Sequence, residues 1–225
     1  MARMQIFNEA ALNAFDDPPS FGHRERQSTF DFSSSLIELA RTLREPTYQV
    51  LFLVSCGYFK ASRRFFSSAS YHQRDLEYVA RALSVADVTD WNYPDRARQR
   101  HQKVILEFYG FRPFGLDAVK ILETEIATMA GQYLKPRLIF ERCTDLLVQQ
   151  KYQLPKAGTL IELIRAGVHA RKANLIGVMD IQLNDNARAL LNGLFETADG
   201  SSRYRLTLLK RISQSIRDIL AATPR

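Results

Sequence analysis

One helix of this chain is delimited by its own sequence signals, between Tyr93 and Phe114. Pro94 suits the first turn of a helix, because proline has no N–H to lose there and its φ is already helical. Gly110 can adopt the left-handed conformation that ends a helix, and Pro113 cannot continue one. The spacing therefore predicts a single helix between these signals, which any fold of the chain must accommodate.

This predicted helix has two different faces. Spacings of three, four and seven residues predict a core stripe, made of Ala97, His101, Val104, Ile105 and Phe108. A basic, amide-bearing face lies on another side and consists of Arg96, Gln99, Arg100 and Lys103. Such cations bind phosphates, and Arg or Gln can form paired hydrogen bonds with purine edges in the major groove. The alternative is a solvated charged face, partly neutralised by Asp95 and Glu107.

The same periodicity recurs along the chain and predicts an all-α fold of about eight to ten helices. The apolar segment 48–59 is too rich in large side chains for a surface helix, so it is expected to be a central buried helix. Gly57 is expected to permit a turn, followed by a polar cluster at 60–64. Helix, glycine turn and second helix are the outline of a helix-turn-helix, in which Arg63 and Arg64 would be candidate readers of bases.

Domain organisation is indicated by Pro155 and Gly158, which interrupt two strong helical patterns. They predict a first helical subdomain over residues 1–153 and a second over 154–225. Residues 1–30 are expected to form an irregular N-terminal arm with a short amphipathic piece over 6–15.

The second subdomain is expected to carry further basic residues. Arg165, His169 and Lys172 stand together beside the apolar stripe of a helix that begins near Thr159, and Arg171 projects into that stripe. The next helix should bury Ala187, Leu190, Leu191 and Leu194. A last helix, over about 204–220, has a basic side formed with Arg203, Lys210 and Arg217. Two basic modules on one DNA site would raise affinity through effective concentration.

Charge favours a polyanionic partner, since the net charge is +7 and the pI is about 9.5. Residues 1–93 hold 10 Lys and Arg against 11 Asp and Glu, 94–154 hold 10 against 7, and 155–225 hold 11 against 6. The positive excess therefore begins at the helix with the basic face. Cys56 and Cys143 lie in apolar helical patterns, which indicates a reducing compartment. No run is long enough to span a bilayer, and the N-terminus lacks a signal peptide's apolar region.

Catalytic motifs are missing from the sequence. It has no phosphate-binding G-x-x-x-x-G-K-[ST] loop, no G-x-G-x-x-G, no H-E-x-x-H and no G-x-S-x-G. The four histidines are far apart and have no partners at zinc-ligand spacing. We therefore expect no catalytic residue, no metal site and no cofactor.

Three stretches resemble one known family. The run from Tyr93 to the YGFRPF motif at 109–114 resembles the N-terminal region of the Tn-three type transposases, large replicative DDE enzymes of bacterial transposons. LFLVSCGYFKASRRFF at 51–66 and YQLPKAGTLIELI at 152–164 are similar to further segments of those proteins, in the same order. The resemblance implies a bacterial, nucleoid-associated cytoplasmic protein that binds double-stranded DNA at transposon terminal inverted repeats. The family's catalytic region follows the part resembled here, so no DDE residue is assigned.

The resulting hypothesis is a sequence-specific DNA-binding domain. Phosphate contacts are expected from Arg96, Arg100, Lys103, Lys172, Lys210 and Arg217. Base contacts are expected from Arg63, Arg64 and Gln99. Arg112, Arg165 and Arg203 complete the candidate DNA-binding set. The alternatives are a helical protein–protein or dimerisation module of the transposase, with a possible homodimer through the full-length protein, and an enzyme of unrecognised type.

Overall fold

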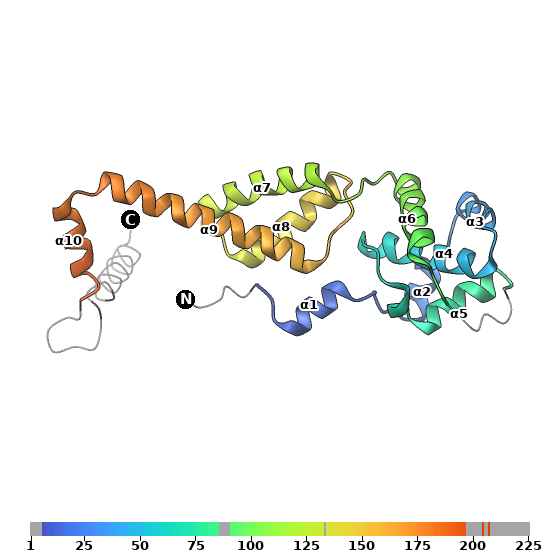
Figure 1. Ribbon diagram of the computed structural model, residues 1–225. Helices are drawn as coiled ribbons and strands as arrows, with labels where there is room; N and C mark the ends of the chain where they lie inside the picture. Colours follow the sequence, from blue (N-terminus) through green and yellow to red (C-terminus); the bar gives the residue numbers. More distant parts are fainter. Residues whose placement is uncertain (1–5, 86–90, 133, 197–203, 205–206, 208–225) are drawn as a thin grey trace, which may run out of the picture. The chain divides into compact units, whose positions relative to one another are not determined.

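The computed structural model describes residues 6–85, 91–132, 134–196, 204 and 207 of the 225-residue chain (Figure 1). These residues form α-helices and no strand, so the predicted all-α fold is confirmed. The helices are α1 (Glu9–Asp16), α2 (His23–Thr29), α3 (Ser34–Arg41), α4 (Pro46–Ser62), α5 (Gln73–Ala82), α6 (Asp95–Tyr109), α7 (Leu116–Gly131), α8 (Pro136–Gln149), α9 (Ala157–Gln182) and α10 (Asp185–Gly193). A 3₁₀ turn, Ser68–Ser70, lies between α4 and α5. No helix in the described part is long and apolar enough to cross a membrane. The chain divides into two compact units, residues 1–171 and 172–225.

The first hydrophobic core is built around α4, whose residues from Val50 to Phe59 are all buried. α2, α3, α5 and α6 pack against this helix. A helix that is apolar on every side needs neighbours on every side, which is why its sequence lacks a polar face. The prediction of a central buried helix is confirmed.

The prediction of a turn at Gly57 is wrong, because α4 continues through this residue to Ser62. A Cβ atom at position 57 would lie 2.3 Å from the ring of Phe30, so glycine here permits the close approach of an aromatic ring. The helix ends instead at Arg63, in the left-handed conformation with φ 59°. The helix-turn-helix outline centred on Gly57 is therefore corrected: extended residues and the 3₁₀ turn separate α4 from α5.

The second hydrophobic core combines α7, α8 and the first part of α9 with residues from the N-terminal segment. Phe7 and Phe15 place their rings edge-on against Phe140, with centroids 4.7 and 5.1 Å apart. The expected irregular arm is thus largely helical from residue 9, including α2, for which no helix was expected. The N-terminal segment is held by residues that are distant in the sequence: Arg26 of α2 pairs with Asp75 of α5 at 2.6 Å.

The two cores of the first unit are joined by backbone hydrogen bonds. Arg112 N–H donates to the Lys151 carbonyl at 2.7 Å, and the Arg112 carbonyl accepts from Gln153 at 2.9 Å, forming an isolated parallel bridge. Leu154 N–H donates to the Arg63 carbonyl at 2.9 Å. The boundary expected after residue 153 lies inside the first unit, because Leu154 and the start of α9 are buried in the second core.

The second unit contains the end of α9, and α10. Arg188 of α10 pairs with Asp180 of α9 at 3.1 Å. Leu190 and Leu191, which were expected to be buried, are exposed. The described helices of this unit are too small to enclose a side chain, and α10 has no buried residue. Apart from Tyr204 and Thr207, the last predicted helix lies outside the described residues.

Candidate nucleic-acid interface

The basic face of α6 is exposed as the sequence predicts. Pro94 is the N-cap residue of this helix and Gly110, with φ 67°, ends it. The outward side chains of the α6 basic face are Arg96, Gln99, Arg100 and Lys103. Ala97, His101 and Ile105 are buried on the other side. One correction applies: Phe108 is 40% exposed, and Leu106 packs in the first core instead.

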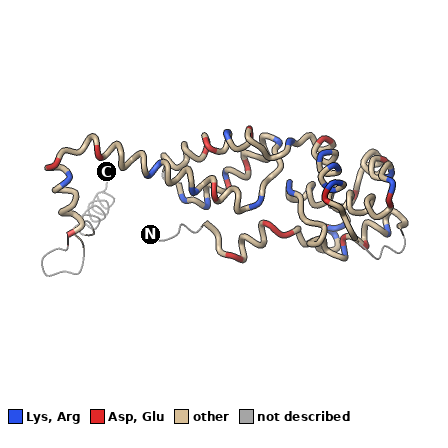
Figure 2. The backbone as a smooth tube through the Cα atoms, in the orientation of Figure 1, with Lys and Arg blue, Asp and Glu red and all other residues tan. Residues whose placement is uncertain are grey.

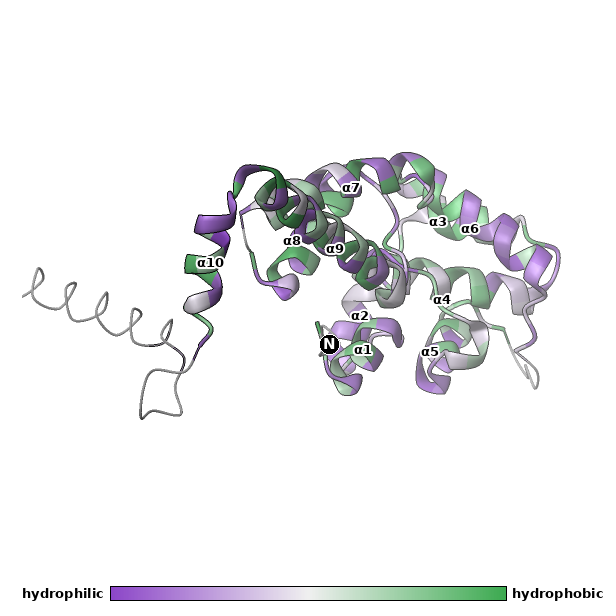
Figure 3. Ribbon diagram, turned by 60° about the vertical axis from the view of Figure 1, so that its left-hand side comes forward, coloured by the Kyte–Doolittle hydropathy of each residue, from purple (hydrophilic) through white to green (hydrophobic). Residues whose placement is uncertain are grey.

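The three cations of the α6 basic face form no ion pair within the described part of the chain. Arg98, which is half-buried on the same helix, pairs with Asp95 at 2.6 Å. Figure 2 shows Lys and Arg along α6, and Figure 3 shows its mixture of hydrophilic and hydrophobic residues. The cations Arg96, Arg100 and Lys103 are therefore presented to solvent next to the amide of Gln99, the combination that phosphate and base-edge contacts require.

Behind this face, His101 is a neutral part of the core. Burial, assisted by the charge of Arg100, lowers the pKa of His101. The hydroxyl of Tyr93 and His101 Nδ1 share a hydrogen bond of 2.5 Å, and burial raises the pKa of Tyr93. This buried hydrogen bond fixes the start of α6 against the first core and thereby orients the basic face.

Arg63 and Arg64 lie elsewhere, in contacts within the first unit. Arg63 donates to the carbonyls of Phe59 and Lys60 and lies 5.4 Å from the Phe111 ring centroid. The guanidinium of Arg64 lies 4.0 Å from the centroid of the Phe15 ring, and its side chain is only 12% exposed. Neither belongs to the α6 basic face, and base reading by these two arginines stays a prediction.

The remaining candidates are dispersed. Arg112 lies in the link between α6 and α7, where its guanidinium donates to the Gln150 carbonyl at 3.1 Å and lies 4.0 Å from the Tyr152 ring. Arg165 is half-buried on α9, and Lys172 is exposed farther along that helix. Arg203, Lys210 and Arg217 lie outside the described residues. Among the described candidates, the four on α6 form one exposed face.

A pocket of about 240 Å³ was not predicted from the sequence. Its basic lining residues are Arg64, Arg98 and Lys156, which come from three separate segments of the first unit. Only the tertiary packing brings these three cations together, so their spacing along the sequence does not predict the pocket. Lys156 precedes α9 directly, in the proline-containing turn that was interpreted as a domain boundary.

Neither cysteine offers a reactive site. Cys56 and Cys143 are buried as free thiols, and burial raises the pKa of both, that of Cys143 to about 12. In the part of the chain that the structure describes, no three His, Cys, Asp or Glu side chains gather as metal ligands.

Comparison with known proteins gives a family and no activity. No curated protein sequence matches the chain. Residues 6–167 match a domain family described as a domain of unknown function, DUF4158. This range takes in both hydrophobic cores, the α6 basic face and the pocket. The match covers well over half of the sequence, so the chain belongs to the DUF4158 family.

Proposed function

We propose that this chain is a sequence-specific DNA-binding module of a replicative transposase that recognises the transposon's terminal inverted repeats. The observation that carries the proposal is the α6 basic face: three cations and one amide on a single exposed, well-anchored helix. Its charges can hold phosphates, while Gln99 and the arginines can reach base edges. The resemblance of 93–114 to Tn-three type transposases supports the same function. The module itself has no catalytic role in this proposal, and it would act in the bacterial cytoplasm, at the nucleoid.

The test is binding to a duplex carrying the terminal inverted repeat of the transposon that encodes the chain, compared with a scrambled duplex of equal length across a salt series. The proposal expects the repeat to bind at least about a thousandfold more tightly, with affinity falling steeply as salt rises. Equal affinity for the two duplexes would reduce the proposal to a basic surface without sequence specificity. No binding at low salt would overturn it.

Two charge-matched triple variants locate the interface. Arg96→Gln, Arg100→Gln and Lys103→Gln together remove three cations from the α6 basic face. If each contacts one phosphate, the slope of log affinity against log salt should become shallower by about 2.7. The control removes three exposed cations elsewhere in the first unit, through Arg41→Gln, Arg44→Gln and Lys120→Gln. Equal losses in both variants would contradict a specific role for α6.

A second candidate function is a helical protein–protein module. It is favoured by exposed apolar side chains in the second unit, including Ile176, Met179 and Ile181 of α9 and Leu190 of α10. Apolar surface exposed on neighbouring helices is typical of association sites. Sedimentation equilibrium tests this function, since self-association should weaken when Ile181 and Leu190 are replaced by serine. A monomer at all concentrations would exclude homodimerisation through this surface.

A further inference from the structure

The pocket lined by Arg64, Arg98 and Lys156 has the composition of an anion site. Among the described residues, its other polar lining side chains are the hydroxyl-bearing Ser67 and Ser70 and one carboxylate, Asp16. Three cations against one carboxylate give the pocket an excess of positive charge. Its volume of about 240 Å³ exceeds what a single water occupies, so a tetrahedral oxyanion fits together with solvent.

Arg64 supplies the second observation. Its Nε and Nη1 atoms are buried and have no hydrogen-bond partner among the residues that the structure describes. The Asp16 carboxylate lies 3.8 Å from Nη1, beyond hydrogen-bond distance. The rings of Phe15 and Phe66, 4.0 and 5.3 Å from the guanidinium carbon, stabilise its charge but accept no hydrogen bond of ordinary strength. Burial lowers the pKa of Arg64, in keeping with a cation that lacks full compensation.

Asp16 is also held by a second contact. Its Oδ1 accepts a hydrogen bond from the Ala157 N–H at the start of α9, at 2.9 Å. The carboxylate is thus positioned by the helix terminus as well as by Arg64. Unpaired buried donors are unfavourable, and a guanidinium is suited to two parallel hydrogen bonds with an oxyanion.

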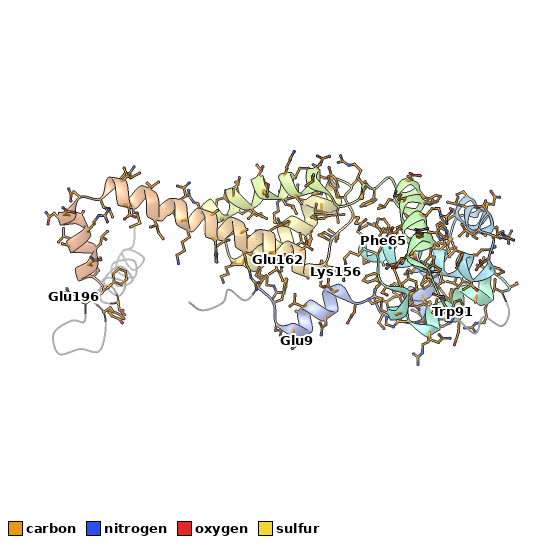
Figure 4. All side chains as sticks on the ribbon, in the orientation of Figure 1. Glu9, Phe65, Trp91, Lys156, Glu162 and Glu196 are labelled. Atoms are coloured by element: carbon orange, nitrogen blue, oxygen red, sulfur yellow. The ribbon has the colours of Figure 1, made fainter. Side chains whose placement is uncertain are left out.

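The lining cations differ in how firmly they are held. Arg98 already pairs with Asp95, and its side chain is 27% exposed. Lys156 is exposed at the rim, where a flexible ammonium can follow the ligand. Figure 4 labels Lys156 and Phe65, two of the residues that line the pocket. The arrangement combines one enclosed guanidinium, one guanidinium paired with Asp95 and one flexible ammonium.

We propose that this pocket binds a phosphate group, between the segment 64–70, Arg98 of α6 and the turn 154–156. The phosphate chemistry has two sources, a phosphodiester of bound DNA and free phosphate. Binding of a DNA phosphodiester in the pocket would add a contact to the proposed DNA-binding function and rests on that function. Binding of free phosphate does not depend on it. Arg98 belongs to the same helix as the α6 basic face, on the side of that helix that faces the first core.

The first experimental arm uses inorganic phosphate and needs no DNA. The melting temperature of the full chain should rise saturably with phosphate at constant ionic strength and should not rise with chloride. Lys156→Gln should abolish the rise, because it removes a rim cation without disturbing the core, and Lys120→Gln should leave it intact. No rise in the unmodified chain, or an equal rise in Lys156→Gln, would overturn a free-phosphate site.

The second arm identifies the DNA source with duplexes that carry one uncharged methylphosphonate at successive positions. At one position the unmodified chain should lose about tenfold in affinity, the equivalent of one hydrogen bond to a charged group. Lys156→Gln should be insensitive at that position and should bind repeat and scrambled duplexes more weakly by the same factor. A positive first arm without such a position assigns the pocket to free phosphate.

The two proposals fail in different ways. If the repeat is preferred but Lys156→Gln behaves like Lys120→Gln in both arms, the pocket proposal is overturned and the DNA-binding function stands. If phosphate stabilises the chain through Lys156 but no duplex binds, the pocket is supported and the proposed function fails. Arg98→Gln provides the second variant, and it should reproduce the effect of Lys156→Gln in whichever arm is positive.

Discussion

Replacing Asp75 by asparagine tests the hydrogen-bonded network that fastens α2 and α5 to α4. The side chain of Asp75 is fully buried and accepts from Arg26 Nε at 2.6 Å and from the Tyr58 hydroxyl at 2.9 Å. Arg26 also donates to the Phe21 carbonyl, and the Tyr58 oxygen accepts from His72 N–H at 3.1 Å. An asparagine has only one acceptor oxygen, so its NH₂ group must face one of the two donors.

The magnitude follows from the burial of this pair. Removing one partner of a buried ion pair costs about 3–5 kcal/mol. The Arg26 side chain retains 16% exposure, so water partly compensates it and the lower end, about 3 kcal/mol, is expected. A denaturant slope of about 2 kcal/mol per molar converts this loss into a urea midpoint lower by about 1.5 M.

The assay is urea denaturation followed by the fluorescence of Trp91, the single tryptophan, which packs against the first core. Asp95→Asn is the matched control, because it removes a 78% exposed carboxylate from an ion pair and should cost less than about 1 kcal/mol. Arg26→Met with Asp75→Asn should cost clearly less than the sum of the single variants. A loss below about 1 kcal/mol in Asp75→Asn, or additivity in the double variant, would refute the reasoning.

Two further predictions concern the first core. Gly57→Ala should lower the free energy of unfolding by about 1–3 kcal/mol, because its Cβ would lie 2.3 Å from the Phe30 ring. Urea denaturation measures this loss. Gly158→Ala, whose Cβ would meet no atom within 4 Å, is the control, and an equal loss in this variant would contradict the explanation. The free energy of unfolding should fall as the pH is lowered through about 6.5. His101 is protonated there in the unfolded state, whereas its lowered pKa keeps it neutral in the folded state, so protonation favours unfolding. Urea denaturation at pH 5.5 and 7.5 should show a smaller difference for His101→Gln, and an unchanged difference would disprove the assignment.

A helix could be predicted from the sequence where the residues that start it, end it and define its faces all lie in one stretch. α6 was predicted with its ends and its basic face because Pro94, Gly110 and the helical periodicity all lie within one stretch. Gly57 was misread because its reason is nonlocal: a phenylalanine twenty-seven residues earlier occupies the space beside it. A glycine in a strongly apolar helical pattern can serve packing as well as turning.

The candidate site divides in the same way. Residues on one face of one helix can be grouped from spacing, as Arg96 and Arg100 were. The positions of Arg63 and Arg64 depend on where α4 ends and on which rings surround them, and no spacing within their own segment encodes Phe15 or Phe111 as neighbours. The pocket could not be predicted from the sequence for the same reason, because Lys156 and Arg64 come together only in the folded chain.

The net charge of +7 is therefore a poor measure of the charge offered to DNA. Arg26 is neutralised by a buried carboxylate and Arg64 is enclosed by rings, whereas the three cations of the α6 basic face are exposed. If that face contacts three phosphates and the pocket holds one more, log affinity should fall with log salt at a slope of about −3.6. The slope of the unmodified chain could also be steeper than this, while the α6 triple variant still makes it shallower by only about 2.7. That result would require phosphate contacts from cations outside the α6 basic face and the pocket. Lys172, Arg203, Lys210 and Arg217 would then be the first to replace by glutamine.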